Sequence, residues 1–344
     1  MVSNIMTSKM TAESTIPVEK DPDVLAAAAR MAGEDLCSVS DLSSAEVRAI
    51  LKLGHDVKRN PREYRHALDA KQMVLMFEKA SLRTRIAFET GINTMGGNAV
   101  FVDQTSSPLG ERETIYDVAK NLERWVDVIV LRTYAHDTIT EMAANSRVPV
   151  INALSDFEHP CQALADFMTI EEHFGTAAGL SFTYVGDGNN VCHSMMLTGA
   201  QLGTNVTVAT PRGYSPDIEI VTKAREIAAV NGCEIRLTQD PQAAVEGTDA
   251  VYTDVCVSMG FEHESAKRSP IFRPFQVNEA LMAKAKPTAV FMHCLPARRN
   301  EEVTDAVIDS PQSIVFDQAE NRLHAQKALL LLLLGGLANV ASFQ

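Results

Sequence analysis

The sequence lacks several features that define common classes of protein. It has no C-x-x-C pair, because its six cysteines are scattered from Cys37 to Cys294. Such spacing is typical of reduced thiols in a cytosolic protein and disfavours disulfides or a zinc site. It also lacks an excess of positive charge, since the formal net charge is −13. A broad basic face for nucleic acid is therefore excluded, and any anion site must concentrate a few basic residues in one place.

Targeting and membrane signals are missing as well. No secretory apolar region is present near the start, and the first thirty residues hold only Lys9, Lys20 and Arg30 against several acids. We therefore expect no transit peptide and a cytoplasmic location. The apolar run at 328–334 is too short to span a bilayer and predicts a buried helix instead. No internal repeat or low-complexity segment accompanies it.

What is present is an alternation of short apolar runs and helical patterns. With 344 residues and 46% hydrophobic residues, the chain suffices for about two domains with packed cores. The alternation predicts an α/β fold with two doubly wound parallel-sheet domains joined by helices. The strands are expected at 73–77, 99–102, 126–131 and 148–151 in the first half, and at 180–185, 205–209, 234–237, 250–253, 289–292 and 313–316 in the second.

Helix signals complete this outline. Ser43 or Ser44 is expected to cap a helix that runs to about residue 53, with acidic residues in its first turn. Further helices are expected at 113–124 and 191–202. A long helix at 162–174 is expected to end the first half and to hold the hinge between the domains. Residues 1–33 are expected to form a flexible lead-in.

The segment 77–85 follows an apolar run and precedes a helical pattern. Ser81 stands where the N-cap of that helix belongs, so the free N–H groups of the first turn favour an anion. Arg83 and Arg85 add two planar donor groups, and Thr84 adds a hydroxyl. The sequence therefore predicts a phosphate site. The alternative is an ordinary capped surface helix with solvated arginines.

Polar residues also follow several of the expected strands. Ligands of open parallel sheets bind outside the carboxyl ends of the strands, and those ends share one edge of the sheet. Any single residue there is more often structural, but the set as a whole predicts one site. The set consists of Arg132 and the residues at 159–162, 254–260, 293–296 and 320–322.

At these residues the sequence resembles the carbamoyltransferases, and within them the ornithine branch. The family's S-T-R-T-R stands here as Ser81-Leu82-Arg83-Thr84-Arg85, and its H-P-x-Q as His159-Pro160-Cys161-Gln162. Its H-C-L-P begins at His293 and its A-E-N-R at Ala319. The loop D-x-x-x-S-M-G at 254–260 separates the ornithine branch from the aspartate branch. The resemblance extends from about Gly33 to Gly336.

The resemblance implies a transfer of the carbamoyl group of carbamoyl phosphate to the δ-amine of L-ornithine, which gives L-citrulline and phosphate in arginine metabolism. It implies a carbamoyl phosphate-binding domain at 34–160 and an ornithine-binding domain at 161–320. A C-terminal helix at 321–344 would pack back on the first domain. It further implies a homotrimer or a multiple of trimers, without metal or cofactor, and with no nucleic acid or membrane as partner.

The resemblance also assigns site residues. Carbamoyl phosphate is expected to contact Ser81, Leu82, Arg83, Thr84, Arg132, His159, Gln162, Cys294, Leu295 and Arg322. Ornithine is expected to contact Asn190, Asp254, Ser258 and Met259. The catalytic set implied within these is Arg83, Arg132, His159, Asp254 and Cys294.

Some residues depart from the family pattern, and one departure makes acylated ornithine an alternative substrate. Leu82 stands where the ornithine enzymes usually have threonine, and leucine there occurs in relatives that carbamoylate acylated ornithines. Cys256 and Pro108 depart from the pattern as well. Asp254 nevertheless favours free ornithine, because a carboxylate pairs with an α-ammonium group and an acylated amine has none.

Two other classes of protein compete with this interpretation. A nicotinamide dehydrogenase is suggested by Gly186-x-Gly188 after an expected strand, but Val191 stands where G-x-G-x-x-G requires its third glycine. A non-catalytic phosphate-binding relative is the other alternative. Such a relative would be expected to lack the cradle arginines or His159, and this sequence retains them.

Overall fold

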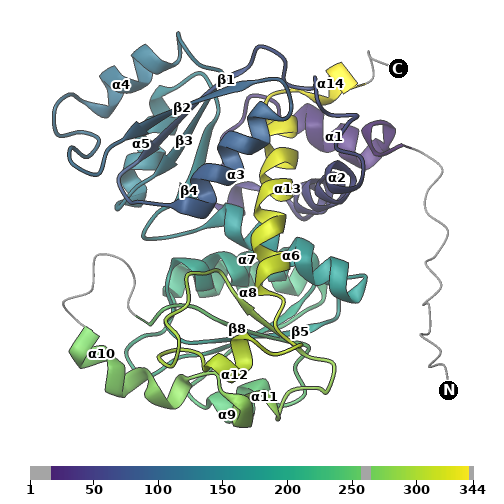
Figure 1. Cartoon of the computed structure of the whole chain (residues 1–344), viewed down its shortest axis with the longest axis vertical. Coiled ribbons are helices and arrows are strands. Elements are labelled where there is room, and N and C mark those ends of the chain that lie inside the picture. Colours follow the sequence, from purple (N-terminus) through teal and green to yellow (C-terminus); the bar gives the residue numbers. More distant parts are fainter. Residues whose placement is uncertain (1–16, 257–264, 341–344) are drawn as a thin grey trace.

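The computed structural model describes residues 17–256 and 265–340, which form two lobes built on separate parallel sheets (Figure 1). In the first lobe the strand order is β2-β1-β3-β4. Its strands are β1 (Gln72–Phe77), β2 (Asn98–Asp103), β3 (Val128–Arg132) and β4 (Val150–Leu154). In the second lobe the order is β7-β6-β5-β8-β9. These strands are β5 (Ser181–Val185), β6 (Asn205–Ala209), β7 (Ile235–Thr238), β8 (Ala250–Thr253) and β9 (Val290–His293).

Alternate residues of each sheet enter different cores, which confirms the expected doubly wound α/β architecture. On β1, Met73 and Leu75 pack in the large core that spans the molecule, whereas Val74 and Met76 pack in a second core with residues of α4 and α5. Sheets buried on both faces need apolar residues at successive positions, and β1 and β3 supply them.

The helices fall into three groups. Around the first sheet lie α3 (Leu82–Asn93), α4 (Ile115–Leu122) and α5 (His136–Asn145). The second lobe contains α7 (Asn190–Leu202), α8 (Ile218–Asn231), α9 (Pro241–Val245), α10 (Ser265–Phe272), η4 (Arg273–Phe275), α11 (Glu279–Met282) and α12 (Asp305–Ile308). The remaining elements lie at the junction and the termini: η1 (Val18–Lys20), α1 (Pro22–Met31), η2 (Val39–Asp41), α2 (Ser44–Arg59), α6 (Pro160–Phe174), α13 (Val315–Leu333) and α14 (Leu337–Val340).

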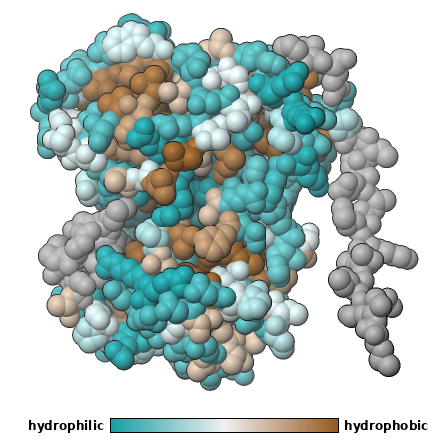
Figure 2. All heavy atoms as spheres, viewed as in Figure 1, coloured by the Kyte–Doolittle hydropathy of each residue, from teal (hydrophilic) through white to brown (hydrophobic). Residues whose placement is uncertain are grey.

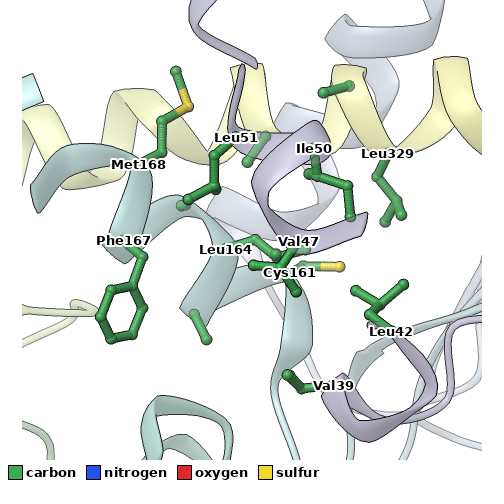
Figure 3. Close-up of a cluster of buried hydrophobic side chains, with 14 of the residues drawn as sticks. Val39, Leu42, Val47, Ile50, Leu51, Cys161, Leu164, Phe167, Met168 and Leu329 are labelled. Carbon is green, nitrogen blue, oxygen red and sulfur yellow. The ribbon is translucent and has the colours of Figure 1, made fainter. Parts of the chain in front are cut away.

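The longest helix of the described chain, α13, extends from the second lobe into the first and packs against α2, α3 and α6 (Figure 1). Apolar side chains of η2, α2, α6 and α13 meet where these helices cross, among them Val39, Ile50, Leu164 and Leu329 (Figure 3). The leucine-rich end of α13 is buried, as expected from the apolar run. No helix among the described residues combines the length and apolar character needed to cross a bilayer.

Two expectations about elements are wrong. Part of the expected flexible lead-in, Pro22–Met31, forms the helix α1. Asp21 caps this helix, which buries Val24, Ala27 and Met31. Residues 1–16 lie outside the described part of the chain. The expected strand at 313–316 is also absent: Ser313 makes only an isolated bridge, and Val315 already begins α13. The terminal helix therefore starts before residue 321, because packing on α6 outweighs the strand propensity of a short apolar run.

Candidate active site

A cleft of about 570 Å³ lies between the lobes, in the size range of small-molecule sites. Its walls come from the residues that follow β1, β3, β4, β5, β8 and β9, so the carboxyl ends of both sheets face it. The space-filling view shows the molecule narrowing between the two lobes, with hydrophobic and hydrophilic residues side by side there (Figure 2). The described residues that the family resemblance assigns to the site all line this cleft: Ser81, Leu82, Arg83, Thr84, Arg132, His159, Gln162, Asn190, Asp254, Cys294, Leu295 and Arg322.

The start of α3 forms the anion cradle at one end of the cleft. Ser81 caps the helix, and its Oγ accepts a hydrogen bond from the Thr84 N–H at 3.3 Å. Arg83 lines the cleft, and burial lowers the pKa of its guanidinium. The side chain of Leu82 is 73% exposed, so only its backbone belongs to the cradle.

Arg85 does not join the cradle, which corrects one part of the sequence interpretation. Its Nε lies 3.0 Å from Oε1 of Glu89, and its guanidinium stacks 3.7 Å from the ring centre of Phe101 on β2. Residues two apart on a helix point in different directions, so only one of the two arginines can face the cleft.

Arg132, the last residue of β3, adds a second buried cation. Burial, and then the charges of Arg322 and Arg83, lower its pKa to about 9. None of the described carboxylates forms a salt bridge with these three arginines. A cluster of unpaired positive charges is favourable when an anion with more than one negative charge lies between them, and a phosphate group has that property.

His159 and Gln162 lie at the first turn of α6, where a proline follows the histidine. His159 is buried, and burial together with the charges of Arg322 and Arg132 holds its pKa well below the ordinary value. The imidazole is therefore neutral. Gln162 Oε1 accepts a hydrogen bond from Arg322, which also donates to Thr84 Oγ1 at 2.8 Å. The last contact joins α13 to the cradle on α3.

Three buried donor or acceptor atoms on the cleft residues have no hydrogen-bond partner within the described chain. They are Nε of Arg132, Nδ1 of His159 and Nε of Arg322. A buried polar atom without a partner costs free energy, and native structures keep few of them. Their convergence on one cleft indicates a polar ligand that hydrogen-bonds to them.

Asp254 and Cys294 face each other on the second lobe. Cys294 Sγ lies 3.0 Å from Asp254 Oδ1, and Asn189 Nδ2 donates to Asp254 Oδ2 at 2.9 Å. Burial, followed by the charge of Asp254, raises the pKa of Cys294 well above its ordinary value. The sulfur is therefore a thiol that donates to the carboxylate, and a thiolate nucleophile is disfavoured.

Leu295 follows Cys294 in a left-handed backbone conformation, with φ of 54°. The Leu295 N–H donates to Nδ1 of His293 at 2.9 Å, and Nε2 of the same ring lies 3.1 Å from Glu302. Asp254, His293 and Cys294 form the one group of possible metal ligands found within the described chain. Because both ring nitrogens of His293 have protein partners, these contacts explain the group without a metal.

Asn190 contributes a contact between the lobes. It begins α7, and its side-chain amide donates to the backbone oxygen of Ser155, which follows β4. Two further residues assigned from the sequence, Ser258 and Met259, lie outside the described residues, and so does most of the loop that carries them.

Glu158 lies directly before His159 and is fully buried at the junction of the lobes. One carboxylate oxygen accepts from the Val39 N–H at 3.1 Å and from Ser194 Oγ at 3.0 Å, and the other accepts from Ser38. Ser194 Oγ in turn accepts from the His159 N–H at 2.9 Å. Burial raises the pKa of Glu158 to about 7.

Several charged or polar residues of the cleft were not assigned from the sequence. They are Lys79, Asp187, Asn189, Arg268 and Arg298. Lys79 stands beside the cradle motif, and Asp187 and Asn189 lie in the glycine-containing turn after β5, so these three could have been found. Arg268, which pairs with Asp187 and donates to the Cys256 carbonyl at 2.7 Å, is placed by the fold of α10 alone.

Fold and cleft together define a two-lobed α/β protein with an anion site between its sheets. The chain belongs to the aspartate/ornithine carbamoyltransferase family. The carbamoyl-P binding domain model of that family matches residues 34–172, and its Asp/Orn binding domain model matches residues 178–333.

Curated relatives and solved structures agree. The chain is 50% identical to an ornithine carbamoyltransferase of Pyrococcus horikoshii over 306 residues, which are 88% of this chain and 96% of that protein. It is 50% identical to the enzyme of Shewanella oneidensis over 296 residues, 86% of this chain and 98% of that one. The solved ornithine carbamoyltransferase of Pyrococcus furiosus superposes with a TM-score of 0.86 at 49% identity, covering 89% of this chain and 98% of that one.

Proposed function

We propose that this chain transfers the carbamoyl group of carbamoyl phosphate to the δ-amine of L-ornithine, giving L-citrulline and phosphate. The observation that carries the proposal is the cleft itself, where an arginine cluster and an aspartate–cysteine pair face each other from the two lobes. Relatives that share half of the sequence are named ornithine carbamoyltransferases. We assign the first lobe, residues 34–160, to carbamoyl phosphate and residues 161–320 to ornithine, with α13 returning to the first lobe.

The cradle on α3 holds the phosphate group. Ser81, the Leu82 N–H, Arg83 and Thr84 surround it from one side, and Arg132 approaches from the end of β3. During the reaction the bond from carbon to the bridging oxygen breaks, so negative charge grows on the departing phosphate. Fixed cations stabilise that charge without reorganising, and this makes the leaving group better.

The carbamoyl group lies against His159, Gln162, Arg322 and the backbone at Cys294 and Leu295. Neutral His159 and cationic Arg322 donate hydrogen bonds to the carbamoyl oxygen, which becomes an oxyanion as the amine attacks. Gln162 accepts from the carbamoyl amide. Most of the catalysis follows from orientation and charge stabilisation, and no step needs a metal or a nucleotide.

Asp254 and Asn190 bind the α-ammonium and α-carboxylate groups of ornithine, and Ser258 and Met259 complete this end. Cys294 lies beside Asp254 and close to the carbamoyl group, so its thiol orients the δ-amine. The amine attacks the carbamoyl carbon in its neutral form. As the new C–N bond forms and the C–O bond breaks, the amine's proton passes to the departing phosphate. The raised pKa of Cys294 supports this role, since a thiol donor leaves the negative charge on Asp254.

The choice between free and acylated ornithine is settled by one experiment. A carboxylate held by Asn189 and Cys294 suits an α-ammonium group, and an acylated amine would leave it desolvated and unpaired. Purified protein with saturating carbamoyl phosphate should form citrulline with kcat/KM at least about thirtyfold higher for L-ornithine than for N-acetyl- or N-succinylornithine. Absence of citrulline, or equal use of an acylated compound, would overturn the proposal.

The proposal extends to assembly and compartment. We propose a trimer or a multiple of trimers, supported by exposed apolar side chains where α3 meets the edge strand β2: Leu82, Ile86 and Val100 are 73%, 50% and 55% exposed. A cytoplasmic location is supported by six cysteines that are all free. Cell fractionation followed by the citrulline assay tests the compartment.

A further inference from the structure

A buried carboxylate lies behind the cleft on α6. Asp166 comes one helical turn after Gln162, is inaccessible to solvent, and does not touch the cleft. Its Oδ1 accepts from Gln162 Nε2 and from Gln318 Nε2, each at 2.7 Å. Its Oδ2 accepts from the Tyr252 hydroxyl at 3.0 Å. One carboxylate therefore joins α6, α13 and β8.

This contact determines which end of the Gln162 amide faces the cleft. A carboxylate can only accept hydrogen bonds and a guanidinium can only donate them. Gln162 lies between Asp166 and Arg322, so its Nε2 must face Asp166 and its Oε1 must face Arg322. The reverse orientation would place two donors together on one side and two acceptors together on the other.

Gln318 is oriented in the same way. Its Nε2 donates to Asp166, which leaves its Oε1 to accept from the His293 N–H at 3.0 Å. His293 ends β9 and directly precedes Cys294. Asp166 therefore supports both sides of the carbamoyl position, through Gln162 on α6 and through the end of β9.

We infer that Asp166 is a positioning residue that fixes the amide of Gln162 and so lets the cleft distinguish carbamoyl phosphate from inorganic phosphate. This inference rests on the proposed function. The carbamoyl amide donates hydrogen bonds and needs an acceptor, which Gln162 Oε1 provides only in the orientation that Asp166 and Arg322 impose together. Inorganic phosphate has no such amide, so its binding depends on the cradle and not on Gln162.

The test compares two ligands in one variant. Asp166→Asn replaces a group that can only accept by one that can also donate, so only the Arg322 contact still orients the Gln162 amide. Titration calorimetry at pH 8.5, above the raised pKa of about 7, would measure Kd for fresh carbamoyl phosphate and for inorganic phosphate. We expect carbamoyl phosphate to bind about tenfold to a hundredfold more weakly, and phosphate to change less than about threefold. Equal weakening of both ligands, or none, would overturn the inference.

Two further variants separate positioning from folding. Tyr252→Phe removes the donor to the other oxygen and leaves the Gln162 contact, so the ratio of the two Kd values should be preserved. In Gln162→Ala, adding Asp166→Asn should change the ratio little, because the two residues act through one contact. If thermal melting shows that Asp166→Asn does not fold, Asp166→Ser serves instead. Wild-type protein that makes no citrulline would refute the proposed function and this inference together, whereas an active wild type with an unchanged ratio refutes the inference alone.

Discussion

At the scale of single residues, the anion cradle uses Arg83 and leaves Arg85 outside. Arg83 lines the cleft together with Arg132 and Arg322, while Arg85 is held by Glu89 and the Phe101 ring. The motif alone does not distinguish the two, because their difference depends on where β2 packs against α3. Their chemical similarity makes them a matched pair for experiment.

Arg83→Ala should lower turnover at least about a hundredfold, because it removes a charged contact worth about 3 kcal/mol from a developing dianion. The melting temperature should stay within a few degrees of wild type, since the arginine has no described salt-bridge partner to lose. Arg85→Ala is the control and should lower turnover by less than about tenfold. Near-normal turnover by Arg83→Ala would argue against the cradle.

A second prediction at this scale concerns pH. The δ-amine of ornithine resembles a lysine amine with pKa about 10.4, so only a small fraction is neutral at pH 7. His159, with its lowered pKa, and Cys294, with its raised pKa, both remain uncharged between pH 7 and pH 8.5. We therefore expect kcat/KM for ornithine to climb steadily over that range in steady-state assays. A flat profile would show that deprotonation of the amine does not control the step.

At the scale of elements, the short strands were the most predictable part of the fold. Asn205–Ala209 has the bounds that its apolar alternation suggests. The prediction of a strand at 313–316 was wrong because the helical state of these residues depends on packing against α6. No local sequence pattern encodes that packing. The helix α1 was missed although its signals are present: Asp21 caps it, proline follows, and Val24, Ala27 and Met31 lie on one face.

In the site, too, some residues could be assigned from local sequence motifs, whereas the roles of others depend on tertiary contacts. Residues in contiguous motifs, such as those at 81–84 and 159–162, could be assigned because their spacing is itself informative. Asp166 and Arg268 could not, since each is a single charged residue within a helical pattern. Their roles arise from partners that are distant in sequence, such as Gln318 for Asp166 and Asp187 for Arg268.

The turn before α6 leads to a prediction about stability. Glu158 has a pKa of about 7 in the folded protein, against an ordinary value of 4.5, so the folded state holds the proton more tightly. Its stabilising contribution is complete below the unfolded pKa and is lost as pH rises through about 7. Between pH 5 and pH 8 the wild type should lose about 2–3 kcal/mol relative to Glu158→Gln.

Urea unfolding at one fixed protein concentration would measure that difference. Exposed Glu226 on α8 provides the control, because Glu226→Gln makes the same change of charge outside the junction. A wild type that keeps the same stability relative to Glu158→Gln at both pH values would contradict the prediction.

At the scale of the whole molecule, the exposed apolar side chains on α3 and β2 lead to a prediction about mass. Leu82 and Ile86 lie one turn apart on α3, and an edge strand such as β2 readily pairs with or packs against another chain. Light scattering at micromolar concentration should give about 112 kDa, three times the chain mass of 37.5 kDa, or a multiple of it. Ile86→Glu should shift the mass downward, and a wild-type mass near that of one chain would refute the trimer.

The position of α13 has a consequence for the order in which the protein is made. The sheet of the first lobe ends at Leu154, but the helix that covers α2, α3 and α6 ends only at Leu333. At roughly 5–20 residues per second, a ribosome needs roughly ten to forty seconds to synthesise the intervening chain. The nascent first lobe therefore exposes the apolar surfaces of these helices until α13 has been synthesised, and exposed surfaces of this kind are prone to aggregate. A premature stop before α13 removes both this cover and Arg322.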